Sequence, residues 1–285
     1  MSGAGARAGA PPTLADAGFT ERRDGIVSAE HAALVAATLD TDPAVLADGV
    51  LPLPWHWTCF LPDAPTAALG PDGHPARRPE MAGFPNRMWV GGRVQSHAPL
   101  RLGRAATRTS ALAAADHKEG STGAFWLLQV EHTVTQDGTR CVEERQDIAL
   151  RAPSPTAVPG TDVRAPDATW VESRTADAPL LFRFSALTFN THRIHYDHPY
   201  ATGVEGYPDL VVHGPLTATL LCDLARRHLG RSVVSLDFRA RAPLFANRPF
   251  FLAGDPVDNG ASTRAVRGDG TTAMSCDVRV APEVA

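Results

Sequence analysis

Hydrophobic residues that alternate with polar ones predict antiparallel strands in the first half of the chain. The segments with this alternation are 88–97, 105–112, 124–134 and 140–150. Asp137-Gly138 lies between the last two and is a strong signal for a hairpin turn. Gly91-Gly92 lies inside the first segment and predicts a bulge or a close approach of another chain segment. Together these patterns favour an antiparallel sheet.

A helical spacing of apolar residues predicts a short helix near the start of the chain. Ser28 is placed to cap this helix, which ends at Leu39. The helix would bury Leu34, Val35 and Leu39 on one face. The segment 52–85 that follows is rich in proline, so we predict a loop with at most one strand there.

The second half contains a longer predicted helix at 215–229. Gly214 and Pro215 are typical of a helix start, and Gly230 is typical of the position after a helix end. Alternating segments surround this helix and predict strands at 179–187, 232–241, 248–253 and 272–280. The predicted order in this half is therefore one strand, a long helix and then several strands. This order is expected of a sheet that wraps around one helix.

The first half repeats this order with a shorter helix. We therefore predict an α+β double hot-dog, in which two antiparallel sheets each wrap around a helix. The proline-containing stretch with little periodicity between the halves is the predicted linker. The predicted boundaries are a disordered tail at 1–14, an N-terminal hot-dog at 15–151, the linker at 152–178 and a C-terminal hot-dog at 179–285.

The composition is that of a folded globular protein and excludes several functions. The 285 residues are 44% hydrophobic and 20% charged, and the net charge is −4. Only Lys118 is a lysine and the arginines are scattered, which argues against a nucleic-acid surface. The four cysteines lie far apart, and no apolar stretch suits a signal peptide or a membrane span. We expect a cytoplasmic protein that binds neither nucleic acid nor membrane.

Reactive side chains concentrate at His192, His195 and His198. Histidine can move a proton at neutral pH. The three-residue steps also permit a metal site, but no carboxylate or cysteine is clearly placed to complete one, so we expect no metal. The histidines could instead pack in a surface loop. This loop leads toward Gly214-Pro215, where the free N–H groups of a helix start can hold an oxyanion. Water addition to an α,β-unsaturated thioester requires such a pair of features.

Two segments of the second half resemble a known family. Residues 184–197 and 206–215 resemble the MaoC-like (R)-specific hydratases, and more narrowly the branch of type 2 hydroxyacyl-thioester dehydratases and 3-methylfumaryl-CoA (mesaconyl-CoA) hydratases. In the first half, 55–62, 70–75 and 87–93 are similar to the N-terminal domain of that branch. The resemblance implies a double hot-dog whose C-terminal unit has the catalytic loop and whose N-terminal unit helps form an acyl-CoA tunnel.

The resemblance also implies roles for individual residues. The family's catalytic loop, D-x-N-P-x-H, falls on Asn190 to His195, so His195 would transfer the proton and Asn190, in place of the aspartate, would orient the water. The backbone N–H of Gly214 would face the thioester carbonyl, with His213 as a wall of the site. The predicted substrate contacts are His192, Tyr196, Trp55, Trp57, Arg87 and Trp89. The alternative to substrate contact for Trp55 and Trp57 is that these two side chains only pack under the proline-rich loop.

The predicted function is the reversible hydration of an enoyl-CoA, with 3-methylfumaryl-CoA to citramalyl-CoA as the best guess. The expected substrate is a small-molecule acyl-CoA, and we expect no cofactor apart from the coenzyme A of that substrate. Three alternatives stay open: a dehydratase whose substrate rides on an acyl carrier protein, an acyl-CoA-binding subunit without turnover, and a thioesterase that uses Asp197 or Glu205. A homodimer is compatible with the sequence but is not established by it.

Overall fold

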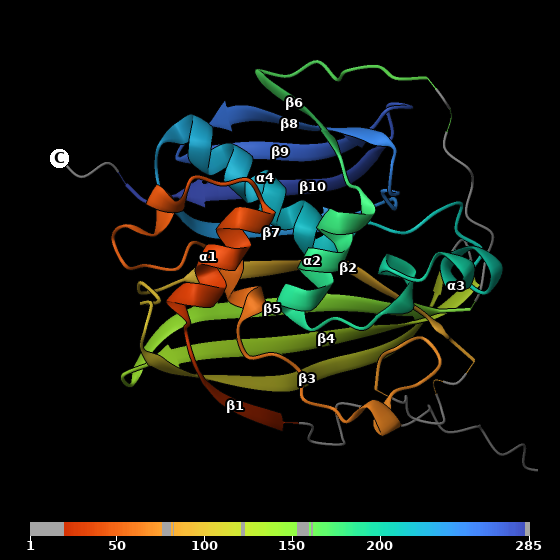
Figure 1. Ribbon diagram of the computed structural model, residues 1–285, viewed down its shortest axis with the longest axis horizontal. Helices are drawn as coiled ribbons and strands as arrows, with labels where there is room; N and C mark the ends of the chain where they lie inside the picture. Colours follow the sequence, from red (N-terminus) through yellow and green to blue (C-terminus); the bar gives the residue numbers. More distant parts are fainter. Residues whose placement is uncertain are drawn as a thin grey trace, which may run out of the picture.

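Ten strands of the described residues form one continuous antiparallel sheet (Figure 1). The computed structural model describes residues 20–75, 81, 83–120, 123–152, 160 and 162–282, so the tail predicted at 1–14 lies outside the described residues. The strands follow the order β1-β3-β4-β5-β2-β7-β10-β9-β8-β6 across the sheet. Their bounds are β1 Thr20–Ile26, β2 Asn86–Ser96, β3 Ala105–Gly120, β4 Gly123–Gln136, β5 Thr139–Arg151, β6 Trp170–Thr175, β7 Val233–Ala240, β8 Pro249–Val257, β9 Gly260–Arg267 and β10 Thr272–Val280.

The two halves of the sheet join where β2 pairs with β7. Gly92 of β2 lies opposite Phe238 of β7. A Cβ at Gly92 would lie 2.6 Å from the Phe238 ring and 2.4 Å from the Arg145 carbonyl O, so the approach requires glycine. A register shift between Trp89 and Gly91 marks a bulge in β2. The bulge and the close approach predicted at these glycines are both confirmed.

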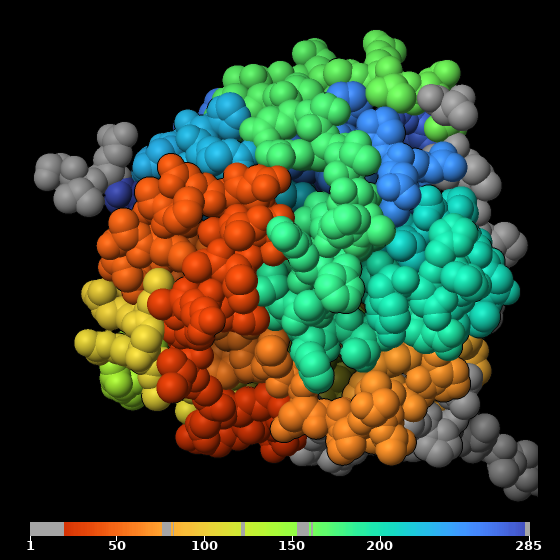
Figure 2. Space-filling view, in the orientation of Figure 1, coloured from red at the N-terminus to blue at the C-terminus, as the bar shows by residue number. Residues whose placement is uncertain are grey.

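The helices differ in length between the halves, as predicted. Their bounds are α1 Ala29–Thr38, α2 Ala178–Thr188, α3 His198–Gly203 and α4 Gly214–Leu229. Ten of the 16 residues of α4 are buried, because this helix packs on β7 to β10 in the C-terminal half. The shorter α1 packs beside α2, and the two segments lie side by side on the face seen in Figure 2. No helix of the described residues is both long and apolar enough to span a lipid bilayer.

Local signals in the sequence set several element ends. Ser28 Oγ accepts a hydrogen bond from the His31 backbone N–H at 3.1 Å and caps α1. Gly230 ends α4 with a φ of 62°. Asp137-Gly138 turns β4 into β5 with φ values of 50° and 76°. These predictions are confirmed, but Leu34, predicted to be buried with Val35 and Leu39, is 53% exposed. The buried face of α1 contains Ala32, Val35 and Ala36, and Leu34 lies outside it.

The strand predicted at 179–187 is wrong, because these residues form α2. Asp177 Oδ1 accepts a hydrogen bond from the Leu180 N–H at 3.0 Å and caps the helix. The buried side chains of α2 recur at helical spacing: Leu181, Phe184, Ser185 and Leu187. The predicted linker contains β6, which pairs with β8 at the edge of the sheet. The prediction also lacks β9, whose residues are mostly small or polar.

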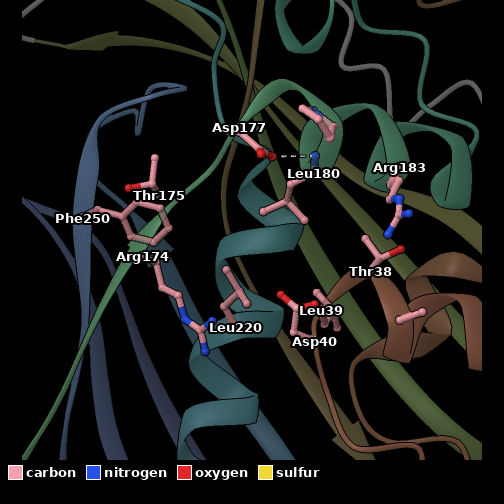
Figure 3. Close-up of a pocket in the computed structure, with 12 residues that line it drawn as sticks. Thr38, Leu39, Asp40, Arg174, Thr175, Asp177, Leu180, Arg183, Leu220 and Phe250 are labelled. Carbon is pink, nitrogen blue, oxygen red and sulfur yellow. Dashed lines mark hydrogen bonds between the residues drawn. The ribbon is translucent and has the colours of Figure 1, made fainter.

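A cavity of about 410 Å³ lies at the amino end of α2 (Figure 3). Arg174 reaches it from β6 and Arg183 from α2, and the end of α1, Leu220 of α4 and Phe250 of β8 also line it. Arg174 also pairs with Glu172 at 3.0 Å. None of the predicted site residues is among the described residues that line this cavity. The predicted catalytic loop lies beyond the opposite end of α2.

Candidate functional site

The loop after α2 holds the predicted catalytic residues in a defined turn. The helix ends where Phe189 adopts left-handed backbone geometry, with a φ of 48°. Asn190 Oδ1 then accepts a hydrogen bond from the His192 backbone N–H at 3.0 Å, and the short 3-10 helix η6 (Arg193–His195) follows. Asparagine suits this position because its short side chain can bond the backbone two residues on. The half-buried Asn190 therefore shapes the loop that presents His195.

His195 is buried and is held by a hydrogen bond to the backbone. Its Nδ1–H donates to the Val211 carbonyl O at 2.7 Å, which leaves the lone pair on Nε2. Burial, and then the positive charge that His192 can acquire, lower the pKa of His195 to about 3, although the Val211 carbonyl opposes this. At neutral pH His195 is an uncharged imidazole whose Nε2 can accept a proton.

His195 lies at the amino end of α4. Its ring stacks on that of His213, with the centroids 3.7 Å and the planes 20° apart. His213 immediately precedes α4, and its Nε2 shares a hydrogen bond with Ser185 Oγ at 2.9 Å. Gly214 is the first residue of α4, so its N–H is one of the donors that a helix start leaves unpaired at the positive end of its dipole. A proton acceptor and a site for an oxyanion are therefore neighbours.

Trp89 brings the N-terminal half into this site. A Cβ at Gly214 would lie 2.8 Å from Trp89 Cε3, so the indole ring lies directly against the start of α4. Trp89 stacks on Phe238, with centroids 4.1 Å apart, and meets the edge of Trp57 at 5.2 Å. The ring therefore forms a rigid wall beside the Gly214 amide.

A buried polar cluster fixes Trp57 behind this wall. The indole N–H of Trp57 donates to Glu144 Oε1 at 2.7 Å, and His56 Nε2 bonds Glu144 Oε2 at 2.9 Å. Burial alone would raise the pKa of Glu144, but the hydrogen bond and the charge of His56 lower it to about 2. Glu144 is thus an ionised carboxylate that orients an aromatic side chain of the site.

The turn at 70–75 docks on the catalytic loop from the N-terminal half. The Arg193 N–H donates to the Asp72 carbonyl O at 3.0 Å, and Thr191 Oγ1 donates to the Gly73 carbonyl O. Gly73 has a φ of 88°, and a Cβ there would lie 1.8 Å from the Thr191 carbonyl O. The sequence placed residues 70–75 in a predicted loop and in a segment of family similarity, but it contained no signal that this segment contacts the catalytic loop.

His192 is buried against His195 and faces a carboxylate. The two rings meet edge to face, with centroids 5.5 Å apart, and the ring of His74 lies 4.6 Å from His192. His192 Nε2 is 3.4 Å from Glu205 Oε1, and both side chains are buried. The sequence suggested Glu205 only as a thioesterase residue, because no local pattern connects it with His192.

The remaining predicted site residues lie at different distances from this cluster. Tyr196 is 47% exposed, and its hydroxyl donates to the Thr191 carbonyl O at 2.9 Å. Arg87 lies on β2 two residues before Trp89 and therefore on the same face of the sheet. Trp55 is buried in the main hydrophobic core. Their roles as substrate contacts stay predictions. Among the described residues, no group of three or more histidine, cysteine or acidic side chains is arranged to hold a metal ion.

A proton acceptor beside an oxyanion site suits a hydratase or dehydratase, and the relatives of the chain show that it is such an enzyme, a hydro-lyase. The family profile of hydroxyacyl-thioester dehydratase type 2 matches residues 54–246, and the chain belongs to this family. It is 43% identical over 269 residues to mesaconyl-C(4)-CoA hydratase of Chloroflexus aurantiacus, covering 92% of this chain and 96% of the relative.

Solved structures agree on the fold. A protein described as a MaoC-like dehydratase superposes with a TM-score of 0.67 at 16% identity, covering 93% of this chain and 98% of that protein. A Mycobacterium tuberculosis protein described as having a double hot-dog fold superposes with a TM-score of 0.53 at 15% identity, covering 94% of this chain and 98% of that protein. At these identities the likeness shows the fold alone, and the predicted double hot-dog is confirmed.

Proposed function

We propose that this enzyme adds water reversibly to 3-methylfumaryl-CoA and gives citramalyl-CoA. The 43% identity to a mesaconyl-C(4)-CoA hydratase supports this substrate. The observation on which the chemistry rests is the neutral His195, whose ring stacks on His213 at the amino end of α4 and whose Nδ1 is bonded to Val211, leaving Nε2 as the proton acceptor. The coenzyme A belongs to the substrate, and the proposal includes no other cofactor.

The proposed reaction uses one proton carrier and one oxyanion site. A water molecule, oriented with the help of Asn190, gives a proton to His195 Nε2 while its oxygen bonds to Cβ of the substrate. The electrons of the double bond move onto the thioester oxygen, where the Gly214 N–H and the dipole of α4 stabilise the enolate. The imidazolium of His195 then gives its proton to Cα as the enolate returns to the thioester. One water is added in total, and the reverse sequence is dehydration.

The family description, a hydroxyacyl-thioester dehydratase, supports one second candidate, a dehydratase of hydroxyacyl thioesters. In this candidate we propose that the thioester is bound to an acyl carrier protein. The two candidates share the chemistry and differ in what holds the thioester. Competition separates them, because free coenzyme A should inhibit an enzyme that recognises the coenzyme and should leave one that recognises a carrier protein unaffected.

The test is an assay of the purified full chain with a panel of CoA thioesters. We expect 3-methylfumaryl-CoA to lose its enoyl-thioester absorbance and mass spectrometry to detect a product heavier by one water. The His195→Ala variant should be inactive while it still binds the substrate. Hydration of none of the enoyl thioesters, or unchanged turnover in the variant, would contradict the proposal. Release of free coenzyme A would indicate a thioesterase instead.

A further inference from the structure

A proton on His195 creates a buried positive charge. A buried charge without a partner is strongly unfavourable, so a compensating anion is expected close to this imidazole. Asn190 occupies the loop position where the resembling hydratases have an aspartate, and an amide has no negative charge to offer. Its Oδ1 already accepts the His192 N–H at 3.0 Å. The anion must come from outside the loop.

The carboxylates around the histidine cluster differ in their partners. Asp197 forms an ion pair with Arg193 at 2.7 Å, so its charge is already balanced. Asp72 Oδ1 accepts a hydrogen bond from the His74 backbone N–H at 3.1 Å and stabilises its own turn. Glu205, in contrast, faces a histidine of the cluster and forms no ion pair with an arginine among the described residues.

Glu205 is a buried carboxylate in an unusual environment. It is 6% exposed and follows α3, and its Oε1 lies 3.4 Å from His192 Nε2. Its Oε2 and the His192 Nε2 that faces it are both buried and form no hydrogen bond among the described residues, so the two side chains are joined by an ion-pair contact. Burial, and then the negative charge of Glu205, raise the pKa of the neighbouring Tyr200 to about 12. A buried carboxylate oxygen without a partner lowers stability, so such groups are retained mainly where they have a function.

The ring of His192 lies between this carboxylate and His195, which it meets edge to face at 5.5 Å. We propose that Glu205 is a positioning residue that acts through His192: it fixes the His192 imidazole and offsets the positive charge that forms on His195 during hydration. The inference rests on the proposed function. No group is transferred to Glu205, since the proton passes from water to His195 and on to Cα. His74 and Tyr200 also face the pair.

The test compares steady-state kinetics of single and double variants on 3-methylfumaryl-CoA. We expect Glu205→Gln to lower kcat by about 10- to 100-fold, the usual effect of losing an orienting partner, and to change KM by less than about threefold. Glu205→Asp should recover part of the rate. Glu205→Gln combined with His192→Gln should be no slower than the slower single variant, because the two residues act as a unit. The control is Asp223→Asn. Asp223 lies on α4, its carboxylate is also buried, and its Oδ2 accepts a hydrogen bond from Thr41 Oγ1 at 2.9 Å. This variant should keep the wild-type kcat.

Two outcomes would overturn the inference. One is a kcat and a pH profile of Glu205→Gln that match the wild type; the other is strictly additive losses in the double variant. A measurement without turnover separates this failure from failure of the proposed function. The ¹⁵N spectrum of the wild type should show His192 protonated at Nε2, toward Glu205, and the signal should change in Glu205→Gln or, if that variant does not fold, in Glu205→Asp. A spectrum with Nε2 unprotonated refutes the pairing whatever the substrate is.

Discussion

A methyl group at Gly214 tests whether the N-terminal half confines the start of α4. The Cβ of Gly214→Ala would lie 2.8 Å from Trp89 Cε3, whereas carbon atoms in contact are about 3.5–4.0 Å apart. Either the indole or the helix start has to move by roughly 1 Å. The indole is hard to move, because it stacks on Phe238 at 4.1 Å and meets Trp57 at 5.2 Å.

Both responses are measurable. Overpacking of this kind destabilises proteins by about 1–3 kcal/mol, so the melting temperature of Gly214→Ala should fall by several degrees. If the helix start moves instead, the amide leaves its position beside His195, and a shift of about 1 Å at a catalytic group lowers kcat by roughly 10²-fold. The assays are thermal unfolding and hydration of 3-methylfumaryl-CoA.

Two further variants identify the cause. Gly203→Ala is the matched control, because a Cβ at Gly203 has no neighbour within 4 Å, and it should change neither quantity. Trp89→Leu removes the ring, so Gly214→Ala should be less harmful in that background than in the wild type. If Gly214→Ala alone keeps the wild-type melting temperature and kcat, the wall formed by Trp89 does not restrain the helix.

The remaining predictions concern the catalytic loop and the buried Glu144. His195→Gln should lower kcat by about 10²- to 10⁴-fold in a stopped hydration assay, and an effect below tenfold would exclude His195 as the proton carrier. Because the pKa of His195 is lowered to about 3, kcat/KM of the wild type should show no loss from protonation of this residue between pH 5 and 8; an inflection near the ordinary histidine pKa would contradict its burial as a neutral base. Gly73→Ala should lower activity and stability more than Gly49→Ala, since both positions have positive φ but only at Gly73 would the Cβ overlap a backbone atom; equal effects would mean that the turn does not hold the loop. The pKa of Glu144 is lowered to about 2 from an ordinary value of 4.5, so its contribution, about 1–3 kcal/mol, is present above pH 4.5 and is lost as the pH falls toward 2. Urea unfolding should therefore find Glu144→Gln less stable than the wild type at pH 7 and nearly equal to it near pH 2.

The sequence predicted those parts of the fold that depend on neighbouring residues. The Ser28 cap, the Asp137-Gly138 turn and the Gly230 end of α4 each follow from the backbone preference of one or two residues, and all are present. The segment that forms α2 contains phenylalanines at alternate positions, Phe182 and Phe184, which is the spacing typical of a strand. In the helix, residues two apart point in nearly opposite directions, so Phe184 is buried and Phe182 is 66% exposed.

The candidate site also contains residues that the sequence indicates and residues that only the folded structure reveals. The histidine loop and the glycine-proline helix start each have a recognisable local pattern, and the family resemblance selects His195 and Gly214 within them. The sequence could not predict the contacts that the histidines make with Glu205, Ser185 and the carbonyl of Val211. These contacts arise from tertiary packing, and no local sequence pattern indicates them.

These contacts make the N-terminal half part of the candidate site. The loop that presents His195 is held from outside by the turn around Gly73, and the helix start at Gly214 is confined from outside by Trp89. Both restraints come from the N-terminal half, and Trp89 is held at the seam where Gly92 lets β2 approach Phe238. A bulky residue at Gly92 should therefore reduce activity even though it contacts no predicted catalytic residue. Since catalytic geometry is sensitive to shifts of about 1 Å, the seam between the halves is as necessary to the proposed chemistry as the imidazole itself.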